Sequence, residues 1–279
     1  MKARKLLLVI ATIALLGTAV CAKDYKDVPD THWAREQIAY LSDEIAGYPD
    51  GTFRPESTVT RAEFVTLLAR TVFPEELKNE TGDTWWKAAY RVCEANNLLS
   101  GSAGYNDAMP RGEIARLLGT FCNGWGGVNE RADAASQYVI NWKEQRMESP
   151  EWQPLFADTK EYETFNSSLR TCTNQGLLTG YPDGSFKPAK GVTRAEAAAI
   201  LARLKAQIVL RETGAEYVCT VGDYWLMQEG QSGTDALVLY EPYSGKKHQT
   251  IRTQLTPEAL LSGRLLTGSD GMYVWGQAG

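Results

Sequence analysis

Two segments of the chain read Gly47-Tyr-Pro-Asp-Gly-Thr-Phe-Arg-Pro55 and Gly180-Tyr-Pro-Asp-Gly-Ser-Phe-Lys-Pro188. Four residues after each closing proline the word Val-Thr-Arg-Ala-Glu begins, and it ends at Glu63 in one copy and at Glu196 in the other. Over Gly47–Arg70 and Gly180–Arg203, 15 of 24 aligned residues are identical. Self-similarity at this level indicates duplicated structural units.

Each copy predicts a helix, a loop and a second helix. In the first copy, apolar residues recur at helical spacing from Trp33 to Ile45, which favours a helix over about residues 32–44. The turn Tyr48-Pro49-Asp50-Gly51 ends this helix, because proline fixes one φ and glycine accepts a positive one. Thr60-Arg61-Ala62-Glu63 then opens the second helix as a capping box, in which the side chains of Thr60 and Glu63 accept each other's backbone N–H.

The later copy follows the same plan, and a degraded copy lies between the two. The later copy has its apolar helix positions at Phe165, Leu169, Cys172 and Leu177, and its capping word is Thr193-Arg194-Ala195-Glu196. The middle copy has them at Trp86, Ala89, Cys93 and Leu98, and Pro110-Arg111-Gly112-Glu113 opens its second helix. Its loop is four residues shorter and lacks the Asp-Gly turn. We therefore expect three helix-loop-helix repeats, at residues 23–75, 79–122 and 153–206.

Two segments fall outside these repeats. Residues 123–152 are expected to form a helical insertion, with a helix from Glu130 to Met147 after a glycine-rich break. Residues 207–279 are expected to form a small β-rich module, because Glu216–Met227, Ala236–Tyr240 and Met272–Trp275 are rich in Val, Tyr and Trp and are separated by glycine-rich turns. The expected fold class is mainly α with this β-rich C-terminal module.

Residues 1–22 have the layout of a secretory signal: a basic start, an apolar run from Leu6 to Leu16, and small residues before Lys23. Polar and small residues interrupt the run, so it is a poor membrane anchor, and no transmembrane span is expected after cleavage. Loss of three positive charges takes the formal net charge from −5 to −8. An acidic, exported protein is a poor partner for nucleic acid or for an anionic membrane surface.

Four cysteines remain after cleavage: Cys93, Cys122, Cys172 and Cys219. Cys93 and Cys172 occupy the same repeat position, which is Ala39 in the first copy, and a small apolar core position explains all three. The spacing also allows a disulfide between Cys93 and Cys122 and does not decide it. The chain has no zinc-type spacing and only two histidines, so no metal centre or cofactor is expected.

With these repeats in place, the chain resembles proteins that carry S-layer homology (SLH) domains. The resemblance covers about residues 24–205, with the insertion as an interruption. It rests on Tyr25-Lys26-Asp27-Val28, His32-Trp33-Ala34, Phe156-Ala157-Asp158 and the two long duplicated words. It implies three repeats in a pseudo-threefold arrangement and anchoring of an exported protein to the bacterial cell envelope. The implied ligand is a secondary cell-wall polysaccharide, often one that carries ketal-linked pyruvate, held in grooves between neighbouring repeats.

The same resemblance nominates the arginines of the capping words as ligand contacts: Arg61, Arg194 and, on a degraded word, Arg111. A guanidinium group matches a carboxylate with two parallel N–H donors, which an ammonium group does not do in a fixed geometry. The alternative is that these arginines are surface residues of the helix caps, paired with nearby acids. Because the middle word is degraded, the expectation is that the middle site is the one impaired.

Other residues of the duplicated words have two interpretations each. Tyr48 and Tyr181 could stack on a sugar face or cover the end of a helix. Asp50-Gly51 and Asp183-Gly184 could present polar groups to sugar hydroxyls or simply form tight turns. The remaining predictions are structural: Thr60, Glu63, Thr193 and Glu196 are helix caps, Trp33 and Trp86 pack into the core, and His32 is solvated.

The expected function is non-covalent anchoring of an exported protein to an anionic wall polysaccharide, and other surface-layer proteins are further candidate partners. No catalytic motif is present, so an enzyme is not expected. Two alternatives stay open at this point. The repeats could tether a cell-wall-active enzyme, or the protein could be a structural subunit of a surface-layer lattice.

Overall fold

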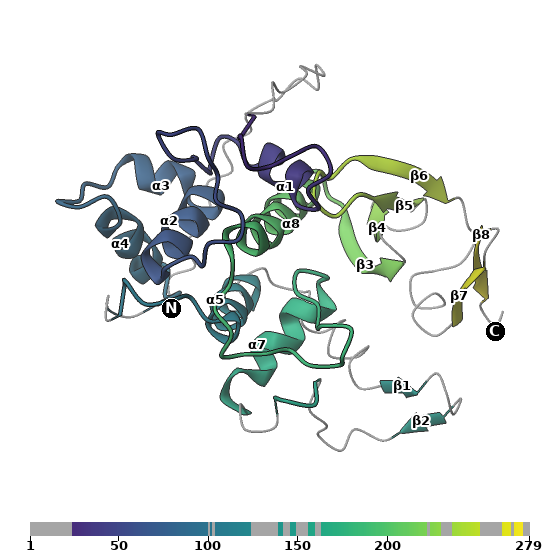
Figure 1. Cartoon of the computed structure of the whole chain (residues 1–279). Coiled ribbons are helices and arrows are strands. Elements are labelled where there is room, and N and C mark those ends of the chain that lie inside the picture. Colours follow the sequence, from purple (N-terminus) through teal and green to yellow (C-terminus); the bar gives the residue numbers. More distant parts are fainter. Residues whose placement is uncertain are drawn as a thin grey trace.

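The computed structural model describes residues 24–99, 101, 104–123, 139–141, 146–148, 156–159, 163–221, 224–229, 236–251, 264–268 and 271–275. The predicted signal segment lies outside these residues. The fold is mainly helical, with a smaller antiparallel sheet at the C-terminal side (Figure 1). None of the described helices is long and apolar enough to span a membrane.

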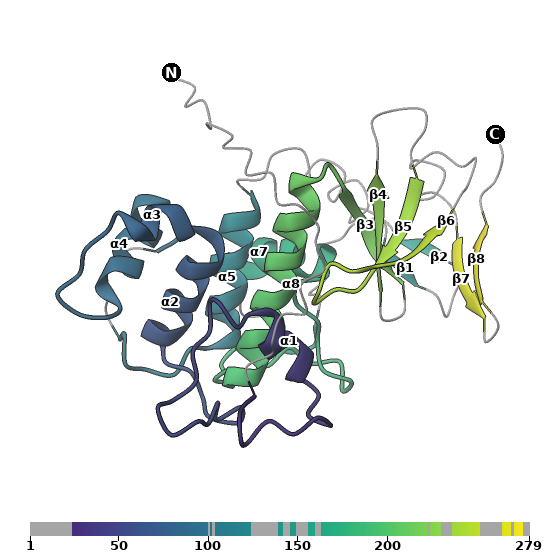
Figure 2. The same cartoon turned by 90° about the horizontal axis from the view of Figure 1, so that it is seen from above.

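The helices are α1 Arg35–Tyr40, α2 Arg61–Val72, α3 Pro74–Lys78, α4 Lys87–Ala95, α5 Arg111–Asn123, α7 Glu163–Asn174 and α8 Arg194–Glu212. They pack in pairs, with α1 against α8, α4 against α2, and α7 against α5. Figure 2 shows α8 between this helical part and the sheet. The helix expected over residues 32–44 is shorter, because turns replace helix on both sides of α1.

A closed ring of backbone hydrogen bonds joins the three segments that precede α2, α5 and α8. The Val59 N–H donates to the Val192 carbonyl at 2.9 Å, the Val192 N–H to the Met109 carbonyl at 3.0 Å, and the Met109 N–H to the Val59 carbonyl at 2.9 Å. All three side chains are fully buried. Each segment therefore satisfies the next, and the ring fixes where the three following helices begin.

Two of these helices begin with the capping box that their sequence predicts. In α2 the Thr60 side chain accepts from the Glu63 N–H and Glu63 accepts from the Thr60 N–H, and Thr193 and Glu196 do the same in α8. The middle copy has Pro110 in the threonine position, and α5 still begins at the next residue. Satisfaction of these N–H groups at each start is worth about 0.5–2 kcal/mol.

The C-terminal part forms a four-stranded antiparallel sheet in the order β3-β4-β5-β6. Its strands are β3 Glu216–Val221, β4 Tyr224–Glu229, β5 Ala236–Tyr240 and β6 Lys247–Ile251, and β7 Arg264–Gly268 pairs separately with β8 Gly271–Trp275. The proposed domain boundary at residue 207 cuts through a continuous helix, because α8 runs on to Glu212. Ala206 and Leu210 of α8 pack into the same apolar cluster as Trp225 and Met227 of the sheet.

The helix predicted from Glu130 to Met147 is wrong over the residues that the structure describes there. Val139–Asn141 and Arg146–Glu148 are short strands, β1 and β2, that pair antiparallel. Val139 and Ile140 are β-branched and favour a strand over a helix, which outweighs the helical spacing of their neighbours. The rest of that prediction lies outside the described residues.

The prediction of a small buried core position holds for two of the three equivalent residues. Cys93 and Cys172 are fully buried, whereas Ala39 is only half buried. Cys93, Cys122 and Cys172 are free thiols, and the Cys219 side chain lies outside the described residues. Burial raises the pKa of the Cys93 and Cys122 thiols to about 12, so both are protonated at neutral pH.

The prediction that Trp33 packs into the core is wrong: its side chain is 58% exposed, whereas Trp86 is buried. The reason is that α1 begins only at Arg35, so the helical face on which the prediction relied does not exist at Trp33. His32 is not simply solvated either. Its Nδ1 accepts from the Ala34 N–H at 3.1 Å and its ring stacks on Trp33.

Candidate functional site

Each of the three arginines reaches the loop of a different copy rather than its own. We name these loops loop 1 (residues 46–58), loop 2 (residue 101 and residues 104–109) and loop 3 (residues 179–191). Arg194 at the start of α8 contacts loop 1, Arg111 at the start of α5 contacts loop 3, and Arg61 at the start of α2 contacts loop 2. The sites are named after these loops, so the loop-1 site holds Arg194, the loop-2 site Arg61 and the loop-3 site Arg111.

Arg194 and Arg111 make equivalent contacts. Arg194 Nε donates to the Phe53 carbonyl at 2.8 Å and its Nη2 to the Ala46 carbonyl at 3.1 Å. Arg111 Nε donates to the Phe186 carbonyl at 3.1 Å and its Nη2 to the Thr179 carbonyl at 2.8 Å. The two arginines are only 7% and 8% exposed. Both are therefore first of all clamps that hold a loop on a neighbouring copy.

Arg61 is held differently. Its Nε donates to the Glu113 carboxylate at 2.7 Å, and its Nη1 lies 3.3 Å from Asp107 Oδ2. A third contact, from Nη1 to the Gly104 carbonyl, is long at 3.5 Å. Arg61 thus pairs with two acids where Arg194 and Arg111 pair mainly with backbone carbonyls. Arg61, from an intact Thr-Arg-Ala-Glu sequence, therefore contacts the degraded loop 2. Arg111, from the degraded sequence, contacts the intact loop 3.

A tyrosine ring lies between cations in both intact loops. Tyr48 has the Arg54 guanidinium carbon 3.8 Å from its ring centre and that of Arg194 at 5.0 Å. Tyr181 has Lys187 Nζ at 4.4 Å and the Arg111 guanidinium carbon at 5.0 Å. Such cation–π contacts are worth about 0.5–2 kcal/mol each, so the ring and its cations hold one another in place.

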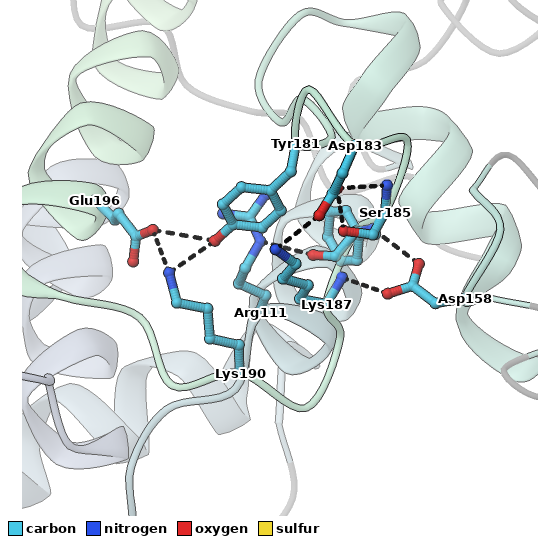
Figure 3. A network of polar contacts seen from close by, with 9 residues as sticks. Arg111, Asp158, Tyr181, Asp183, Ser185, Lys187, Lys190 and Glu196 are labelled. Carbon is cyan, nitrogen blue, oxygen red and sulfur yellow. Dashed lines mark hydrogen bonds and ion pairs between the residues drawn. The ribbon is translucent and has the colours of Figure 1, made fainter.

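In the loop-3 site the Tyr181 hydroxyl links two charged groups (Figure 3). It accepts from Lys190 Nζ at 2.9 Å and donates to Glu196 Oε1 at 3.2 Å. Hydrogen bonds to Tyr181 and Glu196 raise the pKa of the Lys190 ammonium, which keeps it charged at neutral pH. The side chains of Lys187 and Lys190 are each 43% exposed, so this site presents two cations to solvent above the buried Arg111.

Asp50 and Asp183 are engaged inside their own loops. Asp50 accepts from the Thr52 N–H at 3.0 Å and from Arg54 Nη2 at 3.0 Å. Asp183 accepts from the Ser185 N–H at 3.0 Å and pairs with Lys187 Nζ at 3.0 Å. Hydrogen bonds from the Thr52 and Ser185 hydroxyls, then from Arg54 and Lys187 and from the backbone N–H groups, lower the pKa of both carboxyls to about 2. Gly51 and Gly184 have φ values of 81° and 77°, which the turn requires.

A second carboxylate fixes each intact loop from outside, and it was not among the predicted site residues. Asp27 accepts from the Phe53 and Arg54 N–H groups, both at 2.7 Å. Asp158 accepts from the Phe186 and Lys187 N–H groups at 2.8 and 2.7 Å (Figure 3). These contacts hold the next residue of each loop, Arg54 or Lys187, at a positive φ of 58° or 55°.

Sequence reasoning also missed Arg54, Lys187 and Lys190 as exposed cations of the sites. The available signal was the retained positive charge between phenylalanine and proline in both duplicated words. The formal charges now separate the sites. Counting only groups that interact through their side chains, which leaves out Asp158 on the backbone N–H groups, Arg111, Lys187 and Lys190 face Asp183 and Glu196 in the loop-3 site, a balance of +1. In the loop-2 site Arg61 faces Glu113 and Asp107, a balance of −1.

Comparison with known proteins identifies a family for two segments of the chain. The family model described as "S-layer homology domain" matches residues 24–65 and 155–198, which lie within the first and third copies. The chain carries S-layer homology domains. The middle copy lies outside the matched residues, and its SLH character rests on the repeat pattern alone.

Several proteins are similar to this chain at low identity. The chain is 25% identical over 241 residues to the cellulosome-anchoring protein of Acetivibrio thermocellus, which covers 78% of this chain and 46% of that protein. It is 25% identical to S-layer protein EA1 of Bacillus anthracis, over 73% of this chain and 22% of that protein. It is also 25% identical to an amylopullulanase of Thermoanaerobacterium thermosulfurigenes, over 64% of this chain and 9% of the enzyme. The chain therefore spans less than half the length of these relatives.

Proposed function

We propose that this protein is exported and held at the bacterial cell surface by its SLH domains, which bind an anionic wall polysaccharide without a covalent bond. The family match and the relatives named as anchoring and S-layer proteins support attachment at the cell surface in general. We further propose that the three copies form one pseudo-threefold unit. The closed ring through Val59, Met109 and Val192 supports this, because each copy makes the same backbone contact with the next.

The proposed ligand contacts are the cations of the loop-3 and loop-1 sites. Lys187 and Lys190 present exposed ammonium groups beside the Tyr181 ring, and the Arg111 guanidinium lies beneath it. A pyruvyl ketal places a carboxylate next to a sugar ring, which matches cations set beside an aromatic face. In the loop-1 site Arg54 and Arg194 flank Tyr48 in the same way. We therefore assign the buried arginines to support of the loops and the exposed cations to the ligand carboxylate.

This reverses the expectation for the middle copy. Arg111 was the doubtful residue, yet the loop-3 site that it supports has the larger set of exposed cations. Arg61 was a favoured residue, yet two carboxylates already occupy its guanidinium. We propose two anion sites, at loops 1 and 3, and no anion site at Arg61. Tyr48, Asp50, Gly51, Tyr181, Asp183 and Gly184 remain proposed ligand neighbours, in addition to their roles in the turns.

The proposed role is binding rather than catalysis. The amylopullulanase is similar to this chain over only 9% of its own length, a share far too small to be the enzyme as a whole. An exoglucanase of Acetivibrio thermocellus is likewise similar over only 16% of its own length. The shared portion reaches 46% in the cellulosome-anchoring protein and 22% in S-layer protein EA1.

Sedimentation with isolated cell walls tests the proposal. The double variant Lys187→Ala/Lys190→Ala removes both exposed cations and leaves Arg111 and the backbone contacts of loop 3 in place. We expect its affinity for pyruvylated walls to fall at least tenfold, since one charge-assisted hydrogen bond contributes about 1.5–3 kcal/mol. Walls stripped of the pyruvyl group should bind the natural protein as weakly as they bind the variant.

The matched control is Lys78→Ala/Lys246→Ala, which removes two exposed lysines far along the chain from both sites. Equal retention of the wild-type protein, the control and the Lys187/Lys190 variant on pyruvylated walls would show that these cations do not hold the glycan.

A further inference from the structure

The loop-2 site differs from the other two in charge. Glu113 and Asp107 lie 2.7 and 3.3 Å from the Arg61 guanidinium, so one cation meets two carboxylates. The Asp107 side chain is largely exposed, so its negative charge faces the solvent. An acidic sugar would be repelled here, whereas it is attracted at the loop-3 site. Whatever binds at the loop-2 site is selected on a feature other than negative charge.

The same loop carries an aromatic residue where the other loops carry proline. The Tyr105 carbonyl accepts from the Ala62 N–H at 2.9 Å. Pro55 and Pro188 accept in the same way, from the residues that follow Arg194 and Arg111. The Tyr105 ring stacks on Trp86 with ring centres 4.6 Å apart and planes at 21°. Trp86 in turn contacts Tyr90 edge to face at 4.9 Å.

This stack is rigid on one side and open on the other. Trp86 and Tyr90 are buried, so they support the Tyr105 ring, which itself is 37% exposed. Trp85, the chain neighbour of Trp86, is 63% exposed, the most exposed large apolar side chain among the described residues. An exposed aromatic ring that a buried neighbour holds in place, as Trp86 holds Tyr105, is suited to an interaction site, and Trp85 adds a second exposed aromatic side chain next to Trp86 in the chain.

The aromatic stack and the Arg61 cluster form one surface. Gly104, whose carbonyl lies 3.5 Å from Arg61 Nη1, is the residue directly before Tyr105. Burial raises the pKa of Tyr90 to about 12, the Glu113 charge raises it and the Arg61 charge lowers it, so the Tyr90 hydroxyl is within electrostatic range of both side chains. Tyr105, Trp86 and Tyr90 therefore line up next to the acidic end of the site.

We propose that the loop-2 site binds an uncharged pyranose ring of the wall glycan, stacked on Tyr105 and Trp85, with the exposed Asp107 carboxylate accepting sugar hydroxyls. An aromatic face is apolar and complements the C–H face of a neutral sugar. A carboxylate accepts hydrogen bonds from hydroxyls and forms stronger bonds than a neutral acceptor. This inference rests on the proposed glycan-binding function and adds a third site of different specificity. The protein would then bind acidic sugars of one polymer at the loop-1 and loop-3 sites and a neutral sugar of it at the loop-2 site.

Titration of the full chain with chitotetraose, a neutral oligosaccharide, tests the inference, with the tryptophan indole N–H signals in NMR as the readout. We expect the Trp85 and Trp86 signals to shift. Tyr105→Ala and Trp85→Ala should each weaken binding at least tenfold, and Tyr105→Phe, which keeps the stack, should bind like the natural protein. Trp33→Ala is the matched control, because Trp33 is similarly exposed but belongs to α1's preceding turn and not to this surface.

The outcomes separate this inference from the proposed function. Lys187→Ala/Lys190→Ala should leave chitotetraose binding unchanged, so a failure of anion binding alone does not touch the loop-2 site. The inference is overturned if Trp85→Ala and Tyr105→Ala bind chitotetraose as the natural protein does, or if the natural protein does not bind it. Tighter binding of the de-acetylated, cationic tetramer would overturn the assignment to an uncharged sugar. A dimer that Trp85→Ala dissociates, without any saccharide effect, would overturn it in favour of a second copy of this chain.

Discussion

Arg194 and Arg61 hold the same position in identical words, but their surroundings make them unequal. Arg194 is buried and satisfies the carbonyls of Phe53 and Ala46. Replacement by alanine leaves both carbonyls without their donors and removes the packing on Tyr48. We expect Arg194→Ala to lower the free energy of unfolding by about 2–4 kcal/mol. Arg61 pairs with acids that water reaches, so Arg61→Ala should cost about 1 kcal/mol or less.

Urea unfolding of the two variants measures this difference. Arg111→Ala serves as a second test, because its contacts match those of Arg194 and its cost should be similar. A cost for Arg61→Ala as large as that for Arg194→Ala would contradict the assignment of Arg194 and Arg111 as the buried clamps.

The carboxyls of Asp50 and Asp183 predict an acid-sensitive stability. Hydrogen bonds within each turn lower their pKa from 3.8 to about 2 in the folded protein. A lowered folded-state pKa means that the ionised form favours folding. The contribution is therefore fully present above about pH 4 and is lost as the pH falls toward 2.

Thermal unfolding from pH 7 to pH 2 checks the sign. The natural protein should be more stable than Asp50→Asn/Asp183→Asn above pH 4, and the gap should close between pH 4 and pH 2. A gap that stays constant over that range would show that the turns do not depend on the ionised carboxyls.

At the scale of single elements, the helix starts differ by their capping residue. The Thr193 side chain accepts from the Glu196 N–H in α8, and Thr60 does the same for Glu63 in α2. We expect Thr193→Ala to destabilise the protein by about 1 kcal/mol, within the 0.5–2 kcal/mol typical of lost caps.

Thr120→Ala is the control for this substitution, since Thr120 lies within α5, where its hydroxyl donates to the Arg116 carbonyl. Alanine is the better helix former there, so stability should stay constant or rise. If both threonine variants changed the midpoint of chemical unfolding equally, the cap would not be the cause.

The helical part and the sheet are joined by packing of α8 and not by a flexible linker. α8 is one continuous helix from Arg194 to Glu212, and its last two turns pack on the sheet through Ala206 and Leu210. Lys205 pairs with Glu44 at 2.8 Å, which ties the same helix to the first copy. The sheet is therefore part of one packed body with the SLH copies.

At the scale of the whole molecule, two anion sites on one rigid unit predict avidity. A protein whose two sites bind the same polymer chain holds it more tightly than either site alone, by about 10²–10⁴-fold when both sites can be occupied together. We expect Lys187→Ala/Lys190→Ala to lower the affinity for the polysaccharide by about 10²-fold or more, and to leave the affinity of the loop-1 site for a pyruvylated monosaccharide unchanged.

Isothermal titration with polymer and with monosaccharide distinguishes the two effects. Arg54→Ala in the loop-1 site is the mirror experiment and should behave alike with polymer. If either variant lost affinity for the polymer and for the monosaccharide by the same factor, relative to the natural protein, the two sites would not act together.

What the sequence could predict follows from the range of the interactions. The capping boxes at Thr60 and Thr193 and the turns at Gly51 and Gly184 depend on contacts within four residues, and such contacts are written directly in the local pattern. The fold class, the strands after residue 216 and the SLH resemblance come from the same kind of local signal. The prediction failed where another preference outweighed the helical spacing of apolar residues. This happened at Trp33, which lies in a turn before α1, and in the strands near Val139.

The duplicated units, the capped helices and the glycine turns are all specified by local sequence, because each of these features needs only neighbouring residues. Which arginine contacts which loop depends instead on how the three copies pack together. Arg194 reaches Phe53 across 141 residues and Arg111 reaches Phe186 across 75, and no spacing rule orders such contacts. Each arginine contacts the loop of the next copy, in the order set by the ring through Val59, Met109 and Val192. For this reason Arg61 pairs with two acids, and the exposed cations lie in the loop-3 site.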